Sequence, residues 1–164
     1  MMSGLYRDWL LDKGSLTLRL QQRYVDFSVH PSLVVYAKPF VNEAMLLKMA
    51  LHKTAHIREV MLMGNHQAVV FAHSVLPRES LRGRWLGLSC LGNKPLGASL
   101  FANPQVLRTP LSYKKLSRHH LLFKHATQHL HDKPDYLWAR RSVFRLNRAN
   151  MIVTEVFLPR LLQV

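Results

Sequence analysis

The 164-residue sequence is poor in several features that define special classes of protein. Its single cysteine, Cys90, excludes a disulfide-stapled secreted scaffold and predicts a reducing compartment, the cytoplasm. No apolar run approaches the ~18 residues that cross a bilayer. The longest run, residues 68–76, is interrupted by His73 and Ser74. Asp8 and Asp12 flank a short apolar cluster where a signal peptide would carry a basic region, so we expect no leader.

Acidic residues are also scarce. The chain has 9 Asp and Glu against 23 Lys and Arg, which gives a formal net charge of +14. This imbalance favours anionic partners, namely nucleic acid, a membrane surface or a polycarboxylate metabolite. The hydrophobic fraction of 48% excludes intrinsic disorder, and the length suits one domain with one core, residues 1–164.

The hydrophobic patterning predicts an α+β fold, in which helices lie between two antiparallel hairpins. Two pairs of apolar segments, each joined by a short polar turn, predict β-hairpins over residues 57–76 and 137–158. Residues 27–36 predict an edge or bent strand, because Pro31 cannot donate to a sheet. Helices are predicted over residues 5–11, 15–24, 42–52 and 80–91, and after Pro95. Ser15 can cap the second of these helices.

One segment, residues 112–134, is basic and rich in histidine, and we expect it to be an insertion that forms an amphipathic helix. The simplest interpretation is a solvated basic face. An alternative is a weak contact of residues 112–131 with an anionic membrane or nucleic acid, although the segment lacks interleaved exposed aromatics. His125 and His129 are four residues apart, but no acidic or cysteine ligand has supporting spacing, so we expect no metal site.

Glu155 is the most informative charged residue, because it lies in a strand that is apolar on both faces. Burying an unpaired carboxylate costs several kcal/mol, on the order of the effective penalty per ion in proteins. Glu155 therefore needs a cation or a ligand donor beside it, unless its pKa rises.

Three other strand residues, Arg58, His73 and Arg140, supply candidate cations for the same face. If all of them point inward with Glu155, they make a water-poor cavity of net positive charge that suits a small anion. The alternative is that Arg58 or Arg140 forms a purely structural ion pair with Glu155. Glu59 is expected to face solvent or to pair with a lysine or arginine.

Several motifs together resemble the chorismate lyase family, also called 4-hydroxybenzoate synthetase. In order along the chain, the matching segments are residues 8–11, 14–17, 58–62, 75–77, 91–97, 100–101, 137–142 and 154–159. Each motif is modest alone, but they follow the family's order and cover most of the chain. The resemblance implies a single-domain antiparallel sheet with helices packed on one side and an enclosed ligand cavity beneath flap-like helices.

The resemblance also implies an activity. A family member is an enzyme without a cofactor that converts chorismate to 4-hydroxybenzoate and pyruvate for ubiquinone synthesis. Its ligand contacts fall on Arg58 and Glu155 and on the backbone of Leu16 and Leu96. At His73 the family leads us to expect arginine. We expect a monomer whose partners are the substrate chorismate and the product 4-hydroxybenzoate.

In such a site Arg58 would hold a carboxylate and Glu155 would accept the hydrogen bond of the ring hydroxyl or take the ring proton. A second hypothesis is a non-catalytic domain of the same fold that senses a small aromatic acid. Turnover separates the two hypotheses, because a sensor would bind 4-hydroxybenzoate but would never convert chorismate.

Overall fold

The computed structural model describes residues 4–82, 85, 88 and 91–163. Cys90 and half of the predicted helix over residues 80–91 lie outside these residues. The described part opens with a 3₁₀ helix at Arg78–Arg82.

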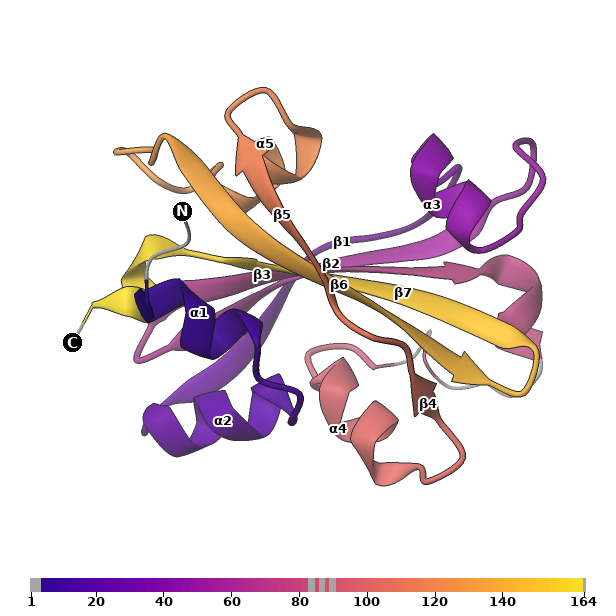
Figure 1. Cartoon of the computed structure of the whole chain (residues 1–164), viewed down its shortest axis with the longest axis horizontal. Helices are drawn as coiled ribbons and strands as arrows, with labels where there is room; N and C mark the ends of the chain where they lie inside the picture. Colours follow the sequence, from indigo (N-terminus) through magenta and orange to yellow (C-terminus); the bar gives the residue numbers. More distant parts are fainter. Residues whose placement is uncertain (1–3, 83–84, 86–87, 89–90, 164) are drawn as a thin grey trace.

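A seven-stranded antiparallel sheet dominates the fold (Figure 1). Its strands follow the order β1-β2-β3-β7-β6-β4, and β5 also pairs with β6. The strands are β1 Phe27–Ala37, β2 Ala55–Gly64, β3 Gln67–Pro77, β4 Leu107–Arg108, β5 Ser112–Ser117, β6 Tyr136–Leu146 and β7 Ala149–Phe157. The two predicted hairpins are confirmed as β2–β3 and β6–β7. The edge strand is confirmed too, with an irregular register between Pro31 and Leu33.

Both hairpin turns rely on residues that tolerate positive φ. Asn65 and His66 join β2 to β3 with φ of 49° and 67°, and Asn147 starts the β6–β7 turn with φ of 56°. A two-residue turn with positive φ matches the right-handed twist of the strands it connects. The turns therefore set the hairpin registers that decide which strand residues face the cavity.

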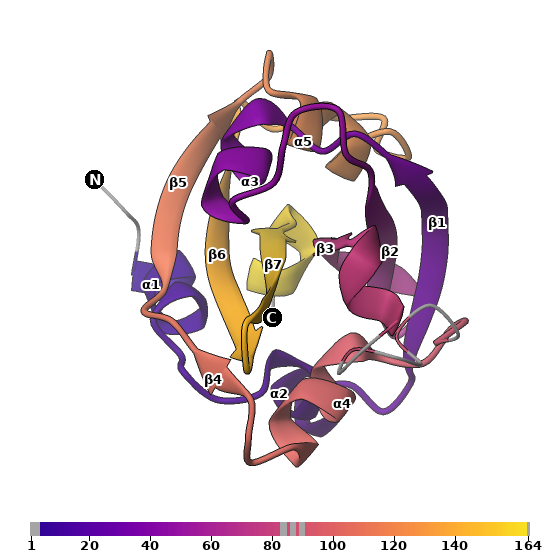
Figure 2. The same ribbon diagram turned by 90° about the vertical axis from the view of Figure 1, so that its right-hand side faces the viewer.

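Helices lie on both sides of the sheet, and the helices that cover the cavity gather on one side as expected (Figure 2). These are α2 Leu16–Arg23 and α4 Leu96–Ala102, and α1 Gly4–Leu10 packs with α2 on the same face. Two six-residue helices, α3 Val41–Leu46 and α5 Leu121–Ala126, lie against the opposite side. The chain ends after a 3₁₀ helix at Pro159–Leu162.

The apolar core is divided by the sheet. On one face Trp9, Leu10 and Leu20 from α1 and α2 pack on the strands, and on the other Leu122 and Phe123 from α5 do so. Ser15 caps α2 as predicted, since its side chain accepts a hydrogen bond from the Leu18 amide at 3.2 Å.

The basic segment differs from its prediction. Residues 112–117 form β5, which pairs with β6, and only Leu121–Ala126 is helical. The amphipathic helix expected from the spacing of Leu121, Leu122, Ala126 and Leu130 is therefore present but short, and the start of the segment is a strand, because pairing with β6 satisfies the backbone of Ser112–Ser117 in extended form. Likewise the helix predicted over residues 42–52 ends at Leu46, and Lys48 follows with φ of 56°.

Candidate active site

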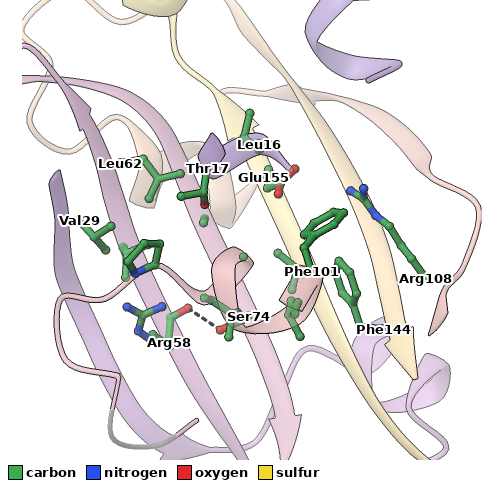
Figure 3. Close-up of a pocket in the computed structure, with 17 residues that line it drawn as sticks. Leu16, Thr17, Val29, Arg58, Leu62, Ser74, Phe101, Arg108, Phe144 and Glu155 are labelled. Carbon is green, nitrogen blue, oxygen red and sulfur yellow. Dashed lines mark hydrogen bonds between the residues drawn. The ribbon is translucent and has the colours of Figure 1, made fainter. Parts of the chain in front are cut away.

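A cavity of about 600 Å³, counting its open part, lies between the sheet and the helices α2 and α4 (Figure 3). Its floor comes from alternate residues of β2, β3 and β7, and its cover from the first turns of α2 and α4. The lining residues are Leu16, Thr17, Val29, Arg58, Val60, Leu62, Ala72, Ser74, Pro95, Leu96, Gly97, Leu100, Phe101, Arg108, Phe144, Val153 and Glu155.

The sheet register places Arg58 and Glu155 on the same cavity wall. Arg58 of β2 is opposite Ser74 of β3, and Glu155 of β7 is opposite Ala72 of the same strand. The two small side chains of β3 leave the floor open between the larger ones. A guanidinium and a carboxylate from distant parts of the chain thus share one chamber.

Arg58 is buried, with 4% of its surface exposed, and its Nη2 atom donates to two carbonyl oxygens. The acceptors are Gly92 O at 3.1 Å and Lys94 O at 2.9 Å, in the segment that leads into α4. No hydrogen bond from its Nε or Nη1 atom to any described residue is found, so these donors remain for a ligand. Burial lowers the pKa of the Arg58 guanidinium from its ordinary value, but arginine stays charged in proteins.

Glu155 is held by Arg140. The Nε atom of Arg140 donates to Oε2 of Glu155, and its Nη1 atom donates to the carbonyl oxygens of Trp9 and Asp12 at 3.1 and 2.6 Å. Arg140 is 1% exposed and does not line the cavity. Arg140 thus forms the ion pair with Glu155 that the sequence analysis left open as the alternative. It supports Glu155 from behind and ties the sheet to the loop after α1.

His73 does not belong to this cavity either. On β3 the cavity side is occupied by Ala72 and Ser74, so the intervening His73 points to the opposite face. There its Nδ1 and Nε2 atoms lie 2.7 Å from Glu59 and 2.8 Å from Glu43. Alternation alone could not reveal this, because both faces of β3 are apolar.

Glu59 corrects a second expectation, because it is buried and pairs with histidines instead of facing solvent or a lysine. His125 of α5 adds a contact of 2.9 Å between its Nδ1 atom and Glu59 Oε1. Burial acts to lower the pKa of His73, but the hydrogen bonds and charges of Glu43 and Glu59 outweigh it and raise that pKa to about 9. For Glu59, burial acts to raise the pKa, but the hydrogen bonds and charges of His73 and His125 lower it overall.

The backbone positions expected to contact the ligand both lie at the cover. Leu16 is the first residue of α2, and Leu96 is the first residue of α4. Amides in the first helical turn have no intrahelical acceptor, so they suit an anion or a ring oxygen. The two helices approach closely at Gly97, where a Cβ atom would stand 2.9 Å from Oγ1 of Thr17.

Sequence reasoning missed Arg108, which also lines the cavity. It lies on the two-residue strand β4, which is too short to show any alternation. Within residues 4–82, 85, 88 and 91–163 there is no group of three His, Cys, Asp or Glu side chains suited to a metal ion. Among the described helices, none is long and apolar enough to cross a bilayer.

Fold and cavity together define a small α+β protein with a cavity between a sheet and two helices, lined by two guanidinium groups and one carboxylate. Solved structures share this fold at low identity. The effector domain of PhnF from Mycobacterium smegmatis matches with a TM-score of 0.62 and 13% identity, covering 92% of this chain and 91% of that chain. A GntR-family transcriptional regulator from Bacillus cereus matches with a TM-score of 0.60 and 10% identity, covering 84% and 95%.

The particular family follows from sequence comparison. The family model described as chorismate lyase matches residues 1–163, and the chain belongs to this family. A relative from Methylobacillus flagellatus, named probable chorismate pyruvate-lyase, is 46% identical over 159 residues, which cover 97% of this chain and 89% of the relative. One of the same name from Thiobacillus denitrificans is 47% identical over 156 residues, with coverage of 95% and 83%.

Proposed function

We propose that this protein is a chorismate pyruvate-lyase, which converts chorismate to 4-hydroxybenzoate and pyruvate, the aromatic precursor of ubiquinone. The observation that carries the proposal is the shared cavity of Arg58 and Glu155 in a chain of the chorismate lyase family. Relatives that cover nearly the whole chain carry the name of this activity. The reaction would take place in the cytoplasm.

The chemistry requires a site that binds a dianion and moves one proton. Chorismate carries a ring carboxylate and, through an ether bond, an enolpyruvyl carboxylate. The proton leaves the ring carbon that bears the hydroxyl, its electron pair completes the aromatic ring, and the neighbouring C–O bond breaks. The departing enolate takes up a proton and becomes pyruvate, so aromatisation supplies the driving force.

In this scheme Arg58 holds the ring carboxylate. Its free Nε and Nη1 atoms lie on two edges of a planar guanidinium, and each can donate to a carboxylate oxygen, whereas lysine offers one compact charge. The same guanidinium binds the carbonyls of Gly92 and Lys94, so anchoring the substrate and positioning α4 depend on one side chain. The amides of Leu16 and Leu96 add fixed dipoles at the cover.

Glu155 acts at the opposite end of the ring. Its Oε2 atom accepts from Arg140, and no described residue donates to its Oε1 atom, which leaves that oxygen for a ligand in the cavity that Glu155 lines. That oxygen accepts the hydrogen bond of the ring hydroxyl or removes the proton from the carbon beside it. Arg140 orients the carboxylate through its Nε donor, which the base needs.

A second candidate function is a non-catalytic sensor of a small aromatic acid, which the fold of the effector domain of PhnF makes reasonable. One experiment separates the two. Purified protein is incubated with chorismate, and pyruvate and 4-hydroxybenzoate are followed together. Equal amounts of both products, formed faster than in buffer alone, support the lyase. Saturable binding of 4-hydroxybenzoate with no release of pyruvate would favour the sensor.

A further inference from the structure

Arg108 is a second arginine that lines the cavity, and the proposed function has so far given it no role. It enters the chamber from β4, where its backbone pairs with Phe144 of β6. Its guanidinium lies 5.5 Å from the ring centre of Phe101 and 5.3 Å from that of Phe144. Figure 3 shows the side chain on the side of the cavity opposite Arg58, with Glu155 between them. Aromatic faces stabilise a guanidinium there without using its hydrogen-bond donors.

The hydrogen bonds of Arg108 are incomplete. Its Nη1 atom donates to Lys13 O at 3.0 Å, but its Nε atom is buried and has no partner among the described residues. A buried donor without a partner is costly, and more so when it belongs to a charged group. An acceptor that arrives with the ligand removes this cost, so the arrangement is typical of a binding residue.

The charges around the cavity point to the kind of ligand that Arg108 receives. The charged lining residues are Arg58, Arg108 and Glu155, and Arg140 pairs directly with Glu155. Three guanidinium groups and one carboxylate leave a net charge of +2 beside the chamber. One carboxylate on the ligand would leave half of this charge unbalanced, whereas a dicarboxylate balances it. Chorismate is such a dianion, and 4-hydroxybenzoate is not.

We propose that Arg108 binds the enolpyruvyl carboxylate of chorismate. This inference rests on the proposed function, because it takes the ring carboxylate at Arg58 and the ring hydroxyl at Glu155. The enolpyruvyl ether is attached to the carbon next to the hydroxyl-bearing carbon. It therefore projects from the Glu155 end of the ring, and the strand order β2-β3-β7-β6-β4 places Arg108 beyond Glu155 as seen from Arg58.

This position has a consequence for the reaction step. As the C–O bond breaks, negative charge develops on the ether oxygen, which lies beside the carboxylate held by Arg108. A fixed guanidinium stabilises that charge more than it stabilises the ground state. After cleavage Arg108 holds pyruvate and Arg58 holds 4-hydroxybenzoate, so each product carries one of the two carboxylates away.

The test compares a dianion with a monoanion. Three variants are prepared: Arg108→Met, Arg108→Lys and the control Arg145→Met, which changes an exposed arginine on the neighbouring strand β6. Affinity is measured by calorimetry for 4-hydroxybenzoate and for 3-(1-carboxyvinyloxy)benzoate, an aromatic dicarboxylate that keeps the enolpyruvyl ether. Turnover of chorismate is measured alongside, and urea unfolding checks that each variant is folded.

We expect Arg108→Met to weaken binding of the dicarboxylate and to lower kcat/KM for chorismate, each on the order of 10- to 100-fold, the range of a hydrogen bond to a charged group. Binding of 4-hydroxybenzoate should change by less than about twofold, since Arg58 holds it. Arg108→Lys should recover part of the loss, and Arg145→Met should match the parent.

Two results would overturn the assignment: equal losses for the dicarboxylate and 4-hydroxybenzoate, or no loss for either. Failure of the proposed function gives a different pattern, in which the parent protein releases no pyruvate from chorismate. In that case the two affinities still decide whether Arg108 recognises the second carboxylate.

Discussion

Arg58 and Glu155 face one cavity from β2 and β7, and only the small side chains of Ala72 and Ser74 on β3 lie between them. Two inter-strand spacings separate the outer strands, roughly 10 Å. The two residues are also offset along the strands, because Arg58 pairs with Ser74 and Glu155 pairs with Ala72. In the proposed function the substrate ring lies between these two groups, and each group serves a different step, which the following variants separate.

Arg58→Ala should weaken binding of both substrate and product. The loss of a charge-assisted contact predicts a rise in KM and in the Kd of 4-hydroxybenzoate of roughly 10- to 100-fold. The same change releases the carbonyls of Gly92 and Lys94, so kcat should fall as well. Steady-state kinetics and product titration measure both effects, with Arg160→Ala on the exposed C-terminal segment as the control. An unchanged product affinity would refute the anchor.

Glu155→Gln should lower kcat and leave binding nearly intact. The amide keeps the size of the side chain and an acceptor for Arg140 but cannot take a proton. The expected loss in kcat is about 10²-fold or more, the range of general acid–base catalysis. Pyruvate release under saturating chorismate measures it, and Glu79→Gln, an exposed carboxylate bound to Lys53, is the matched control. A variant that works at the parent rate would eliminate Glu155 as the base.

Arg140→Leu should destabilise the protein through Glu155. Removing one partner of a buried ion pair leaves a buried charge and costs about 3–5 kcal/mol in the free energy of unfolding. The double variant Arg140→Leu, Glu155→Leu should recover much of this loss, because no charge remains. Urea denaturation measures both, with Lys53→Met as an exposed-pair control expected to cost less than about 1 kcal/mol. No recovery in the double variant would show that the carbonyls of Trp9 and Asp12 are the main partners of Arg140.

The histidine cluster behind the sheet predicts a pH dependence of stability. The pKa of His73 in the folded protein is about 9, raised from 6.5. Its protonated form therefore stabilises the fold fully below about pH 6.5, and this stabilisation is lost as the pH rises through about 9. The shift corresponds to roughly 3 kcal/mol. Because the pKa of Glu59 is lowered, its contribution is lost in acid instead, as the pH falls through the folded value.

Unfolding free energies measured by urea between about pH 6 and pH 10 should therefore fall toward the alkaline end. In His73→Gln this fall should disappear, and in His125→Gln it should persist, because His73 keeps Glu43 and Glu59 as partners. His66→Gln is the control, since His66 is exposed beside Asp26. A parent protein whose stability is flat up to pH 10 would contradict the charged state of His73.

Gly97→Ala should disturb the cover of the cavity. The added Cβ atom would lie 2.9 Å from Oγ1 of Thr17, which is too close, so α4 must move away from α2. We expect weaker binding of 4-hydroxybenzoate and a higher KM, partly restored by adding Thr17→Ala. Gly4→Ala is the control, because nothing lies within 4 Å of a Cβ atom at that position. Unchanged binding in Gly97→Ala would mean that the contact between the two helices does not shape the site.

Much of the secondary structure was predictable because the signals are local. Turn residues between apolar runs predicted both hairpins, Ser15 predicted the start of α2, and Pro31 predicted an edge strand. The basic segment around β5 was misjudged, because its strand is stabilised by pairing with β6, a partner distant in the chain. The strand propensity of the segment's own residues does not indicate that pairing.

For the site, the sequence by itself determined that Glu155 needs a partner, since an apolar strand cannot bury a lone carboxylate. Only the tertiary structure decided that Arg140 is that partner, that His73 faces away from the cavity, and that Arg108 enters it. The physical reason is that alternation separates two faces but does not say which one meets the ligand when both are apolar. That choice depends on strand register and on where α2 and α4 pack, which are properties of the whole fold.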